Sequence, residues 1–335
     1  MKSFISLARG NTFDTFFDNS NIELAKSLGD TVWNMSEHRM SAEEVAEQIG
    51  DCENYITLWS SPRLDEQILN RAPNLKMLTH LGGTVVPFVS DAMWERGIKV
   101  ISGNDYFAES VAEGTLAYML CALRDIPRYS RRLKEEKQWK SSSDYTAGLM
   151  GRTVGLVSYG TIAKKLVKIL SQFKVTVMVY DIRPLPKEDV EKYGLIQASL
   201  ETIFSECDVI SLHTPLFDAT YHLINEELLK KIKDGALFIN TSRGAVVDQQ
   251  ALERELASGR FCAVLDVYEK EPPQEDCPLF DLPSVIMIPH MAGPTVDMHK
   301  YITRELLLES AGYIDHNRPL CHEITRQMAS TMSNK

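Results

Sequence analysis

From residue 150 onward, short runs of Val, Ile and Leu alternate with segments whose apolar residues recur at helical spacing. Within 161–173, for example, Ile162, Leu166 and Leu170 share one helix face. Strands that alternate with helices in this way are typical of βαβ units and a parallel sheet. We expect helices at 161–173 and at 248–259, where Gly259 is the cap, and strands at 153–158, 175–181, 209–215, 236–242, 263–268 and 285–290.

The first hundred residues follow a looser version of the same rhythm, which predicts a second, smaller α/β unit. A helix at 105–122 leads from it into the larger domain, and a helix at 298–316 is expected to return to it. The smaller domain is therefore expected to be discontinuous, at 1–104 and 296–335, with the larger domain at 105–295 and a cleft between them. The apolar runs of the smaller unit lie at 5–8, 55–59, 76–83 and 98–103, separated by helical segments such as 41–49 and 64–72.

Three polar residues stand at the ends of apolar runs: Arg243 in FINTSRGAVVD, Glu271 in VLDVYEKEPP and His290 in VIMIPHMAG. Sites of α/β proteins form where strands end, so a guanidinium, a carboxylate and an imidazole there are expected to share one pocket. The set suits a 2-keto acid, because arginine holds a carboxylate, histidine moves a proton and glutamate tunes the histidine. Taken singly, each residue has another explanation: a surface charge, a turn acid and a structural histidine.

The strand, turn and helix that begin this pattern are a candidate dinucleotide site, because the start of a helix attracts a negative pyrophosphate. The G-x-G-x-x-G frame falls on Ser158, Gly160 and Ala163, so only its middle glycine is present, which also fits an ordinary βα turn. Asp181 ends the next strand, where a carboxylate binds the adenosine ribose and repels a 2′-phosphate. NAD is therefore favoured over NADP, although Arg183 follows two residues later.

Four ordered blocks resemble the D-isomer-specific 2-hydroxyacid dehydrogenases, the family of D-lactate, D-glycerate and D-3-phosphoglycerate dehydrogenases, glyoxylate reductases and formate dehydrogenase. The blocks are GRTVGLVSYGTIAKKL, CDVISLHTPLFDATYHLI, FINTSRGAVVDQQAL, and VLDVYEKEPP followed by VIMIPHMAG. The resemblance implies a Rossmann-type doubly wound parallel sheet with a smaller flavodoxin-like domain. It also implies a homodimer and hydride transfer between NAD and a small 2-keto or D-2-hydroxy acid.

The resemblance assigns roles to individual residues. His290 is expected to be the general acid and base, paired with Glu271, and Arg243 is expected to bind the substrate carboxylate and keto oxygen. Asp266 would hold the nicotinamide carboxamide, and the LHTP stretch would contact the adenosine side of NAD. The NAD-binding positions implied in this way are Ser158, Tyr159, Gly160, Thr161, Ile162, Asp181, His213, Thr214, Pro215, Thr241, Asp266, His290 and Gly293.

One loop departs from the family pattern. The segment GGTVVP at 82–87 stands where better-known members have G-V-G-V-D-N. Gly83 and Thr84 are still expected to offer backbone N–H groups to a substrate carboxylate, but the identity of the acid does not follow from any one relative.

Composition narrows the choice of partners. The net charge is −10 and no basic block stands free of acidic neighbours, which argues against nucleic acid or an anionic membrane surface as partner. The most basic segment, 128–140, contains Glu135 and Glu136 and is expected to be a solvated helix face or a subunit contact. The six cysteines form no C-x-x-C pair and the histidines form no metal-ligand cluster, so we expect reduced, buried thiols and no metal. Without a signal peptide or a long apolar run, a cytoplasmic protein is expected.

Other functions stay open at this point. A non-enzymatic NAD(H)-sensing corepressor occurs within the same family and would keep the fold. Formate dehydrogenase is a further alternative, although its relatives pair the histidine with glutamine, where this chain has Glu271. A methyltransferase would use an acidic strand end for ribose, but it would not need Arg243, Glu271 and His290 together.

Overall fold

The computed structural model describes residues 1–332. Contacts between residues divide the described chain into two compact units: unit 1 comprises Met1–Phe107 together with residues 294–332, and unit 2 comprises Ala108–Gly293. The domain boundaries expected from the sequence were 104/105 and 295/296.

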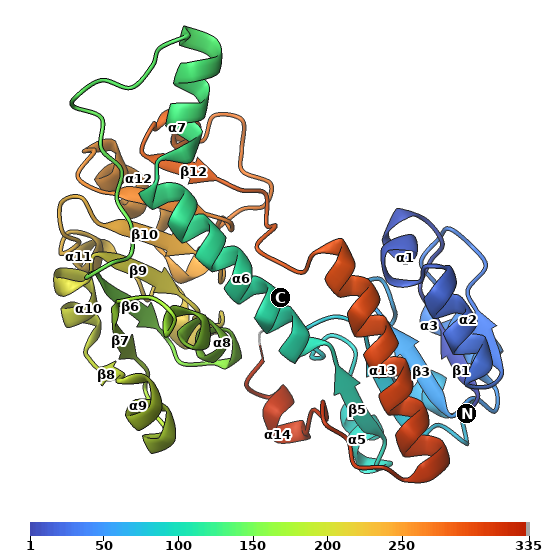
Figure 1. Ribbon diagram of the computed structural model, residues 1–335. Helices are drawn as coiled ribbons and strands as arrows, with labels where there is room; N and C mark the ends of the chain where they lie inside the picture. The colour runs from blue at the N-terminus through green and yellow to red at the C-terminus, as the bar shows by residue number, and fades with distance from the viewer. Residues whose placement is uncertain (333–335) are drawn as a thin grey trace. The chain divides into compact units, whose positions relative to one another are not determined.

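Unit 1 is built around a five-stranded parallel sheet (Figure 1). Its strands, in the order in which they lie side by side, are β2 (Thr31–Trp33), β1 (Ser3–Ile5), β3 (Asn54–Thr57), β4 (Met77–His80) and β5 (Lys99–Ser102). This 2-1-3-4-5 order is that of flavodoxin-like sheets, so the predicted class of the smaller unit is confirmed.

Helices cover both faces of this sheet, and each face has its own apolar core. One core joins the sheet to α1 (Asn11–Phe16), α2 (Asn19–Ser27) and α13 (Val296–His316). The other joins it to α3 (Ala42–Ile49), α4 (Glu66–Leu69), α5 (Asp91–Glu95) and α14 (Arg326–Ala329). Helix α13 packs in the first core, where Ile302, Leu306 and Leu307 are fully buried.

Unit 2 contains a seven-stranded sheet in which every strand pair is parallel. The strands, again in spatial order, are β12 (Val285–Met287), β11 (Cys262–Leu265), β10 (Leu237–Asn240), β9 (Val209–Leu212), β6 (Thr153–Val157), β7 (Thr176–Tyr180) and β8 (Ile196–Gln197). Numbered within the unit, the first six strands follow the 3-2-1-4-5-6 order of a Rossmann sheet. The predicted doubly wound parallel sheet is confirmed, and its direction of winding reverses between β6 and β9.

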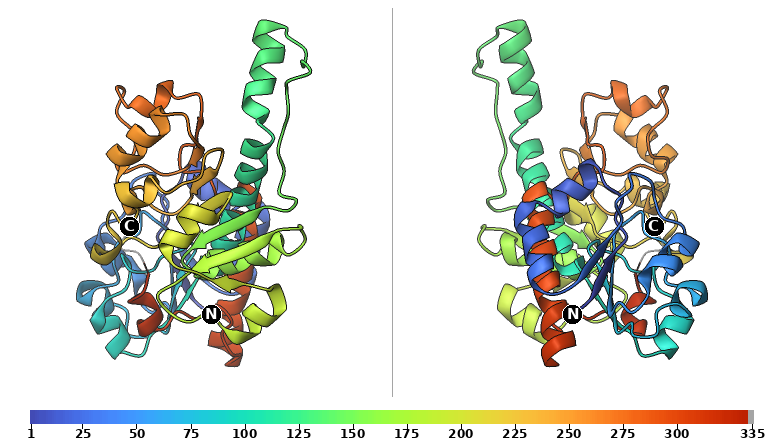
Figure 2. Two further views of the ribbon diagram at one scale, coloured as in Figure 1. Left: turned by 90° about the vertical axis from the view of Figure 1, so that its left-hand side faces the viewer. Right: turned by 90° about the vertical axis from the view of Figure 1, so that its right-hand side faces the viewer.

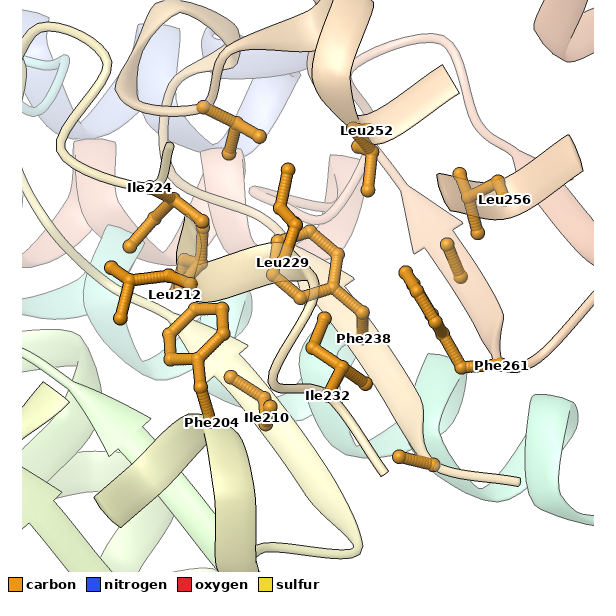
Figure 3. Close-up of a cluster of buried hydrophobic side chains, with 14 of the residues drawn as sticks. Phe204, Ile210, Leu212, Ile224, Leu229, Ile232, Phe238, Leu252, Leu256 and Phe261 are labelled. Carbon is orange, nitrogen blue, oxygen red and sulfur yellow. The ribbon is translucent and has the colours of Figure 1, made fainter. Parts of the chain in front are cut away.

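Two apolar cores hold the helices of unit 2 against this sheet. Figure 3 shows one of them, in which Phe204, Phe238 and Phe261 pack with aliphatic side chains. Each fully buried side chain of this size contributes about 1.5 to 3 kcal/mol relative to exposure to water. The helices that contribute to the core in Figure 3 are α10 (Leu200–Glu206), α11 (Glu226–Leu229) and α12 (Gln249–Ala257). The helices α6 (Asn104–Leu123) and α8 (Thr161–Leu170) contribute to the other core. Helix α9 (Lys187–Tyr193) follows β7 in the chain.

The strands of unit 2 are shorter than the apolar runs suggested. The strand expected at 209–215 ends at Leu212, and the one expected at 285–290 ends at Met287. The apolar runs continue into residues that have left the sheet at its carboxyl edge, so the runs are longer than the hydrogen-bonded strands. The C-cap of α12 is Ser258, and Gly259 comes directly after it with a left-handed φ of 70°, so the glycine expected to cap the helix lies one residue beyond the cap.

Residues 126–150 form an arm of unit 2, which we refer to as the arm. It contains α7 (Ile126–Arg131), a π-helical turn (Arg132–Glu136) and an irregular return, and Figure 2 shows it projecting from the rest of the unit. Trp139 and Tyr145 are 73% and 81% exposed there.

The cysteines are all unpaired thiols, but they are not all buried as expected: Cys262 and Cys321 are exposed, because they lie at the start of a strand and in a surface loop. No helix among residues 1–332 is long and apolar enough to cross a membrane.

Candidate functional site

The carboxyl edge of the unit 2 sheet brings the predicted catalytic residues onto neighbouring strands. Arg243 follows β10, Asp266 and Glu271 follow β11, and His290 follows β12. Because β10, β11 and β12 are adjacent and parallel, their carboxyl ends meet at one edge.

His290 and Glu271 are in direct contact. The imidazole Nδ1 lies 2.8 Å from Glu271 Oε2, and the other carboxylate oxygen accepts the Tyr268 N–H at 3.1 Å. The two side chains are 50% and 38% exposed. The carboxylate is therefore oriented by the protein on one side and faces the imidazole on the other, which leaves His290 Nε2 for proton exchange with a ligand.

The backbone of the His290 turn is held by Asp266. His290 has a left-handed φ of 53°, and its N–H donates to the Asp266 carbonyl at 2.8 Å. The Asp266 carboxylate accepts the N–H groups of Met291 at 2.7 Å and Ala292 at 3.0 Å, and also the Tyr118 hydroxyl at 3.3 Å. This carboxylate is 1% exposed, so its observed contacts orient the turn, and its predicted contact with the nicotinamide stays a prediction.

The backbone of α6 packs directly against the turn that contains His290. A Cβ atom on Gly114 would lie 2.2 Å from the Ala292 carbonyl oxygen, and one on Gly293 would lie 2.9 Å from the Val111 nitrogen. Only glycine allows backbones to approach this closely. The sequence offered no signal for Gly114, because a glycine inside a helix does not reveal which backbone packs against it.

Arg243 stands on a turn that Asn240 fixes. The Asn240 amide oxygen accepts the N–H and the hydroxyl of Ser242, and its amide nitrogen donates to the Arg243 carbonyl at 3.1 Å. The Arg243 guanidinium donates to the Ser242 carbonyl at 2.8 Å. Burial lowers the pKa of Arg243 and the negative charge of Glu271 partly offsets this, but an arginine still stays protonated at neutral pH.

Gly244 packs the Arg243 turn against the turn that carries Glu271. A Cβ atom there would lie 1.9 Å from the Tyr268 carbonyl carbon and 2.3 Å from the Glu269 nitrogen. The Tyr268 hydroxyl donates to the carbonyls of Leu265 and Ile288 at 2.9 and 3.0 Å, which ties the ends of β11 and β12 together. Sequence reasoning missed Asn240, Gly244 and Tyr268, although the first two lie beside Arg243 in the same block.

The predicted nucleotide loop lies between β6 and α8. Ser158 occupies the first fingerprint position with a left-handed φ of 77°, the conformation for which glycine is usually needed. Its hydroxyl lies 2.9 Å from the Thr214 hydroxyl, so the loop after β6 is linked to the loop after β9. Ala163, at the third position, is fully buried between helix and sheet.

The start of α8 is open toward an anion. Gly160 is its N-cap without a side-chain cap bond, and within residues 1–332 no atom other than those of its chain neighbours lies within 4 Å of where its Cβ would be. Thr161 and Ile162 begin the helix with exposed and half-buried side chains. Unsatisfied N–H groups at such an end bind phosphate, so these residues fit the pyrophosphate of a dinucleotide.

Asp181 lies at the end of β7, beside this loop. Its carboxylate accepts the Tyr159 N–H at 2.8 Å and the Arg183 N–H at 2.9 Å, and the Arg183 guanidinium is 3.3 Å away. Burial alone would raise the pKa of Asp181, but these hydrogen bonds outweigh it and lower the pKa. The group is therefore ionised at neutral pH, as binding of a ribose diol requires.

Further predicted cofactor positions lie at the ends of β9 and β10. His213 is buried, its Nε2 lies 3.1 Å from the Ser211 hydroxyl, and burial lowers its pKa to about 4, so it is neutral at pH 7. Its Nδ1 is buried and has no hydrogen-bond partner among residues 1–332. Thr214 and Pro215 follow His213 in the chain. The Thr241 hydroxyl forms a 3.0 Å hydrogen bond with the hydroxyl of Thr115 in α6. An orphaned ring nitrogen and an open helix start fit a bound dinucleotide.

Gly83 and Thr84 belong to unit 1 and follow β4. A Cβ atom on Gly83 would lie 3.6 Å from the Phe107 ring and 3.8 Å from the Asn104 amide oxygen. Nearby, burial lowers the pKa of His80 to about 3, so this histidine is neutral at pH 7. Within residues 1–332, no group of three or more His, Cys, Asp and Glu side chains has the arrangement of a metal site.

Comparison with known proteins assigns this architecture. Residues 116–292 match the family model described as D-isomer specific 2-hydroxyacid dehydrogenase, NAD binding domain. The chain is 33% identical over 255 residues to hydroxypyruvate reductase of Thermotoga maritima, covering 75% of this chain and 82% of that protein. It is 32% identical over 286 residues to glyoxylate reductase of Korarchaeum cryptofilum, covering 83% and 85%. A D-3-phosphoglycerate dehydrogenase from Archaeoglobus fulgidus is 34% identical over 257 residues, but the match covers 76% of this chain and only 48% of that longer protein.

A solved structure gives the same result for the fold. A phosphoglycerate oxidoreductase from Rhizobium etli superposes with a TM-score of 0.81 and 26% identity, covering 97% of this chain and 99% of that one.

Proposed function

Since the chain belongs to the D-isomer-specific 2-hydroxyacid dehydrogenase family, we propose that it interconverts a small 2-keto acid and its D-2-hydroxy acid through His290, Glu271 and Arg243. It is an NAD-dependent oxidoreductase that acts on CH–OH groups. The observation that carries the residue assignment is the 2.8 Å contact between His290 Nδ1 and Glu271, on the turn that packs against Gly244, the neighbour of Arg243.

In the direction of reduction, negative charge develops on the keto oxygen of the substrate. NAD, when bound, supplies the hydride in its reduced form and accepts it in its oxidised form. The Arg243 guanidinium binds the carboxylate and keto oxygen as a planar fork, and His290 Nε2 donates a proton to that oxygen. Glu271 stabilises the imidazolium before the transfer and orients the neutral ring after it. Oxidation uses the same groups in reverse, with His290 accepting the hydroxyl proton.

Gly83 and Thr84 are the unit 1 residues that we assign to the substrate. Their loop carries backbone N–H groups at the carboxyl end of β4, the position where α/β sheets bind ligands. Replacement of Gly83 by Pro removes one N–H group and is expected to raise the KM for the keto acid while the affinity for NADH stays the same.

Turnover of a panel of keto acids tests the proposal. Glyoxylate, pyruvate, hydroxypyruvate, 2-ketoisocaproate and phenylpyruvate are assayed with NADH, for the wild type and for His290→Gln. We expect reduction of at least one acid, and His290→Gln is expected to lose most of this activity. NADH binding by the wild type is measured by nucleotide fluorescence. NADH binding without turnover of any acid would instead favour the sensing protein.

A homodimer is part of the proposal, and we assign the arm to its interface. The arm exposes Trp139, Tyr145 and Leu133, and residues 126–140 carry four more basic than acidic residues in a chain of net charge −10. Apolar side chains within a basic segment suit the acidic surface of a second copy. Light scattering is expected to give the mass of a dimer for the wild type and of a monomer for Trp139→Asp with Leu133→Asp; a monomeric wild type would refute the assignment.

Cytoplasmic location is also a proposal. The six unpaired cysteines support it, since thiols persist in reducing compartments. Cell fractionation of the tagged protein is the test.

A further inference from the structure

Glu269, which is not part of the His290–Glu271 pair, links its own loop to the segment that contains Tyr221 and His222. Its Oε1 accepts the Tyr221 hydroxyl at 3.2 Å and lies 3.1 Å from His222 Nε2. The His222 and Glu269 side chains are about two-thirds buried, at 32% and 33% exposure. Glu269 thus binds the segment that precedes α11 from a position two residues before Glu271.

The segment that contains His222 forms backbone hydrogen bonds with the residues that follow Arg243. The His222 N–H donates to the Ala245 carbonyl at 2.9 Å, and the Ile224 N–H donates to the Val246 carbonyl at 3.0 Å. Ile224 is fully buried in the core that Figure 3 shows, so the segment is anchored as well as paired. A group that holds His222 therefore also holds the turn on which Arg243 stands.

The backbone of Glu269 is fixed on its other side. Its N–H donates to the Gln249 side-chain oxygen at 2.9 Å, at the start of α12. The preceding residue, Tyr268, donates its N–H to Glu271. Glu269 is consequently placed between the turn of Arg243 and the carboxylate that faces His290.

We propose that Glu269 is a positioning residue, which uses Tyr221 and His222 to set the separation between Arg243 and the Glu271–His290 pair. The inference rests on the proposed function, because it takes these three residues as the catalytic set. Glu269 touches neither substrate nor cofactor in this role. A displaced guanidinium binds the carboxylate and keto oxygen less well at the moment when charge develops, so the defect falls on keto-acid turnover rather than on the nucleotide.

The test compares Glu269→Ala with Glu269→Gln in the full-length protein. The glutamine keeps an oxygen that accepts both bonds, whereas alanine removes the acceptor. We expect Glu269→Ala to lower kcat/KM for the best keto acid about ten- to a hundredfold, the range that a misplacement of about 1 Å produces. Glu269→Gln is expected to restore activity to within a fewfold of the wild type, and the Kd for NADH is expected to stay the same in both variants.

Controls separate positioning from folding. Glu275→Ala removes an exposed carboxylate from the same loop and is expected to behave as the wild type. Tyr221→Phe removes one of the two bonds without a cavity, and a small loss of kcat/KM with an unchanged melting temperature is expected, which keeps the proposal testable if Glu269→Ala does not fold.

Three results would overturn the proposal: a Glu269→Ala variant with normal kcat/KM, a Glu269→Gln variant as impaired as the alanine, or a loss of activity that parallels a loss of NADH binding. An inactive wild type would overturn the proposed function and this inference together. An active wild type that loses turnover in His290→Gln, beside an unaffected Glu269→Ala, would overturn only this inference.

Discussion

His290 adopts a left-handed backbone conformation that costs a non-glycine residue about 1 to 3 kcal/mol. The bonds from His290, Met291 and Ala292 to Asp266 hold it there, with the backbone of α6 packed beneath at Gly114. The strain therefore sits at the residue whose ring must point in one direction. The role proposed for His290 therefore depends on bonds that its neighbours, rather than its own side chain, supply.

Arg243→Lys is expected to cost about 2 to 4 kcal/mol of transition-state stabilisation, because an ammonium cannot form two parallel bonds to a carboxylate. Steady-state kinetics with the best keto acid measure the loss as a decrease in kcat/KM, and NADH binding is expected to be unaffected. Arg254→Lys, at an exposed position of α12, is the matched control. Normal kcat/KM in the Arg243 variant would assign this arginine a structural role.

Glu271→Gln is expected to lower kcat/KM for keto-acid reduction, because the carboxylate that lies 2.8 Å from His290 Nδ1 and orients the ring is replaced by a neutral amide. Steady-state kinetics with the best keto acid measure the loss, with Glu275→Gln as control, and the Kd for NADH is expected to stay the same. Normal kcat/KM in Glu271→Gln would mean that this pair does not act together in catalysis.

At the scale of elements, one carboxylate attaches the C-terminal segment of unit 1 to α13. Glu309 accepts the N–H groups of Cys321 and His322 and lies 2.6 Å from His322 Nδ1. The same segment pairs with β5, where Ile101 bridges Glu323 in antiparallel register. The β5 edge of the sheet is thereby covered in part by a bridged segment that a helix holds in place, which hinders pairing of this edge with another chain.

This attachment predicts a stability that depends on pH. The bond to Glu309 raises the pKa of His322 above 6.5; burial would raise the pKa of Glu309, but His322 outweighs it and lowers that pKa below 4.5. The contribution of His322 to the free energy of unfolding is complete below pH 6.5 and is lost as the pH rises through its raised pKa. The carboxylate contribution is complete above pH 4.5 and is lost as pH falls through the lowered pKa. The pair stabilises most between these two limits.

Glu309→Gln is expected to lower the free energy of unfolding by about 1.5 to 3 kcal/mol near pH 5.5, the range for hydrogen bonds to charged groups, and by less at pH 8.5. Urea denaturation at the two pH values measures both. Glu323→Gln breaks the pair with Lys99, which stays charged over this range, so its effect is expected to be small and equal at both pH values. If Glu309→Gln lowered the free energy of unfolding equally at pH 5.5 and pH 8.5, the proposed role of the Glu309–His322 pair would be refuted.

At the scale of the whole molecule, cofactor binding to unit 2 should stabilise the fold in proportion to its affinity. A ligand at 100 times its Kd adds about 2.7 kcal/mol, so NADH is expected to raise the melting temperature. NADPH is expected to raise it less, because the ionised Asp181 repels a 2′-phosphate. Asp181→Ala is expected to make the increases in melting temperature with NADH and with NADPH more similar. Equal shifts with NADH and NADPH in the wild type would contradict the assignment of Asp181.

The sequence by itself determined the two α/β units, the parallel sheet of unit 2 and the family, because these follow from periodicity and from ordered motifs. It also placed Arg243, Glu271 and His290 at strand ends, since polar residues after buried runs leave the sheet at its carboxyl edge. It overestimated strand lengths for the same reason: the apolar pattern does not record where hydrogen bonding between strands stops.

Only the tertiary structure decided which groups orient these residues. Gly114 and Tyr221 are ordinary residues in the sequence, and their roles arise from partners 178 and 48 positions away, Ala292 and Glu269. Such contacts depend on how separate strands and helices pack, and a linear pattern does not encode distances between them. The left-handed turns at Ser158 and His290 have the same origin, because neighbouring loops, rather than the residues themselves, supply the bonds that hold them.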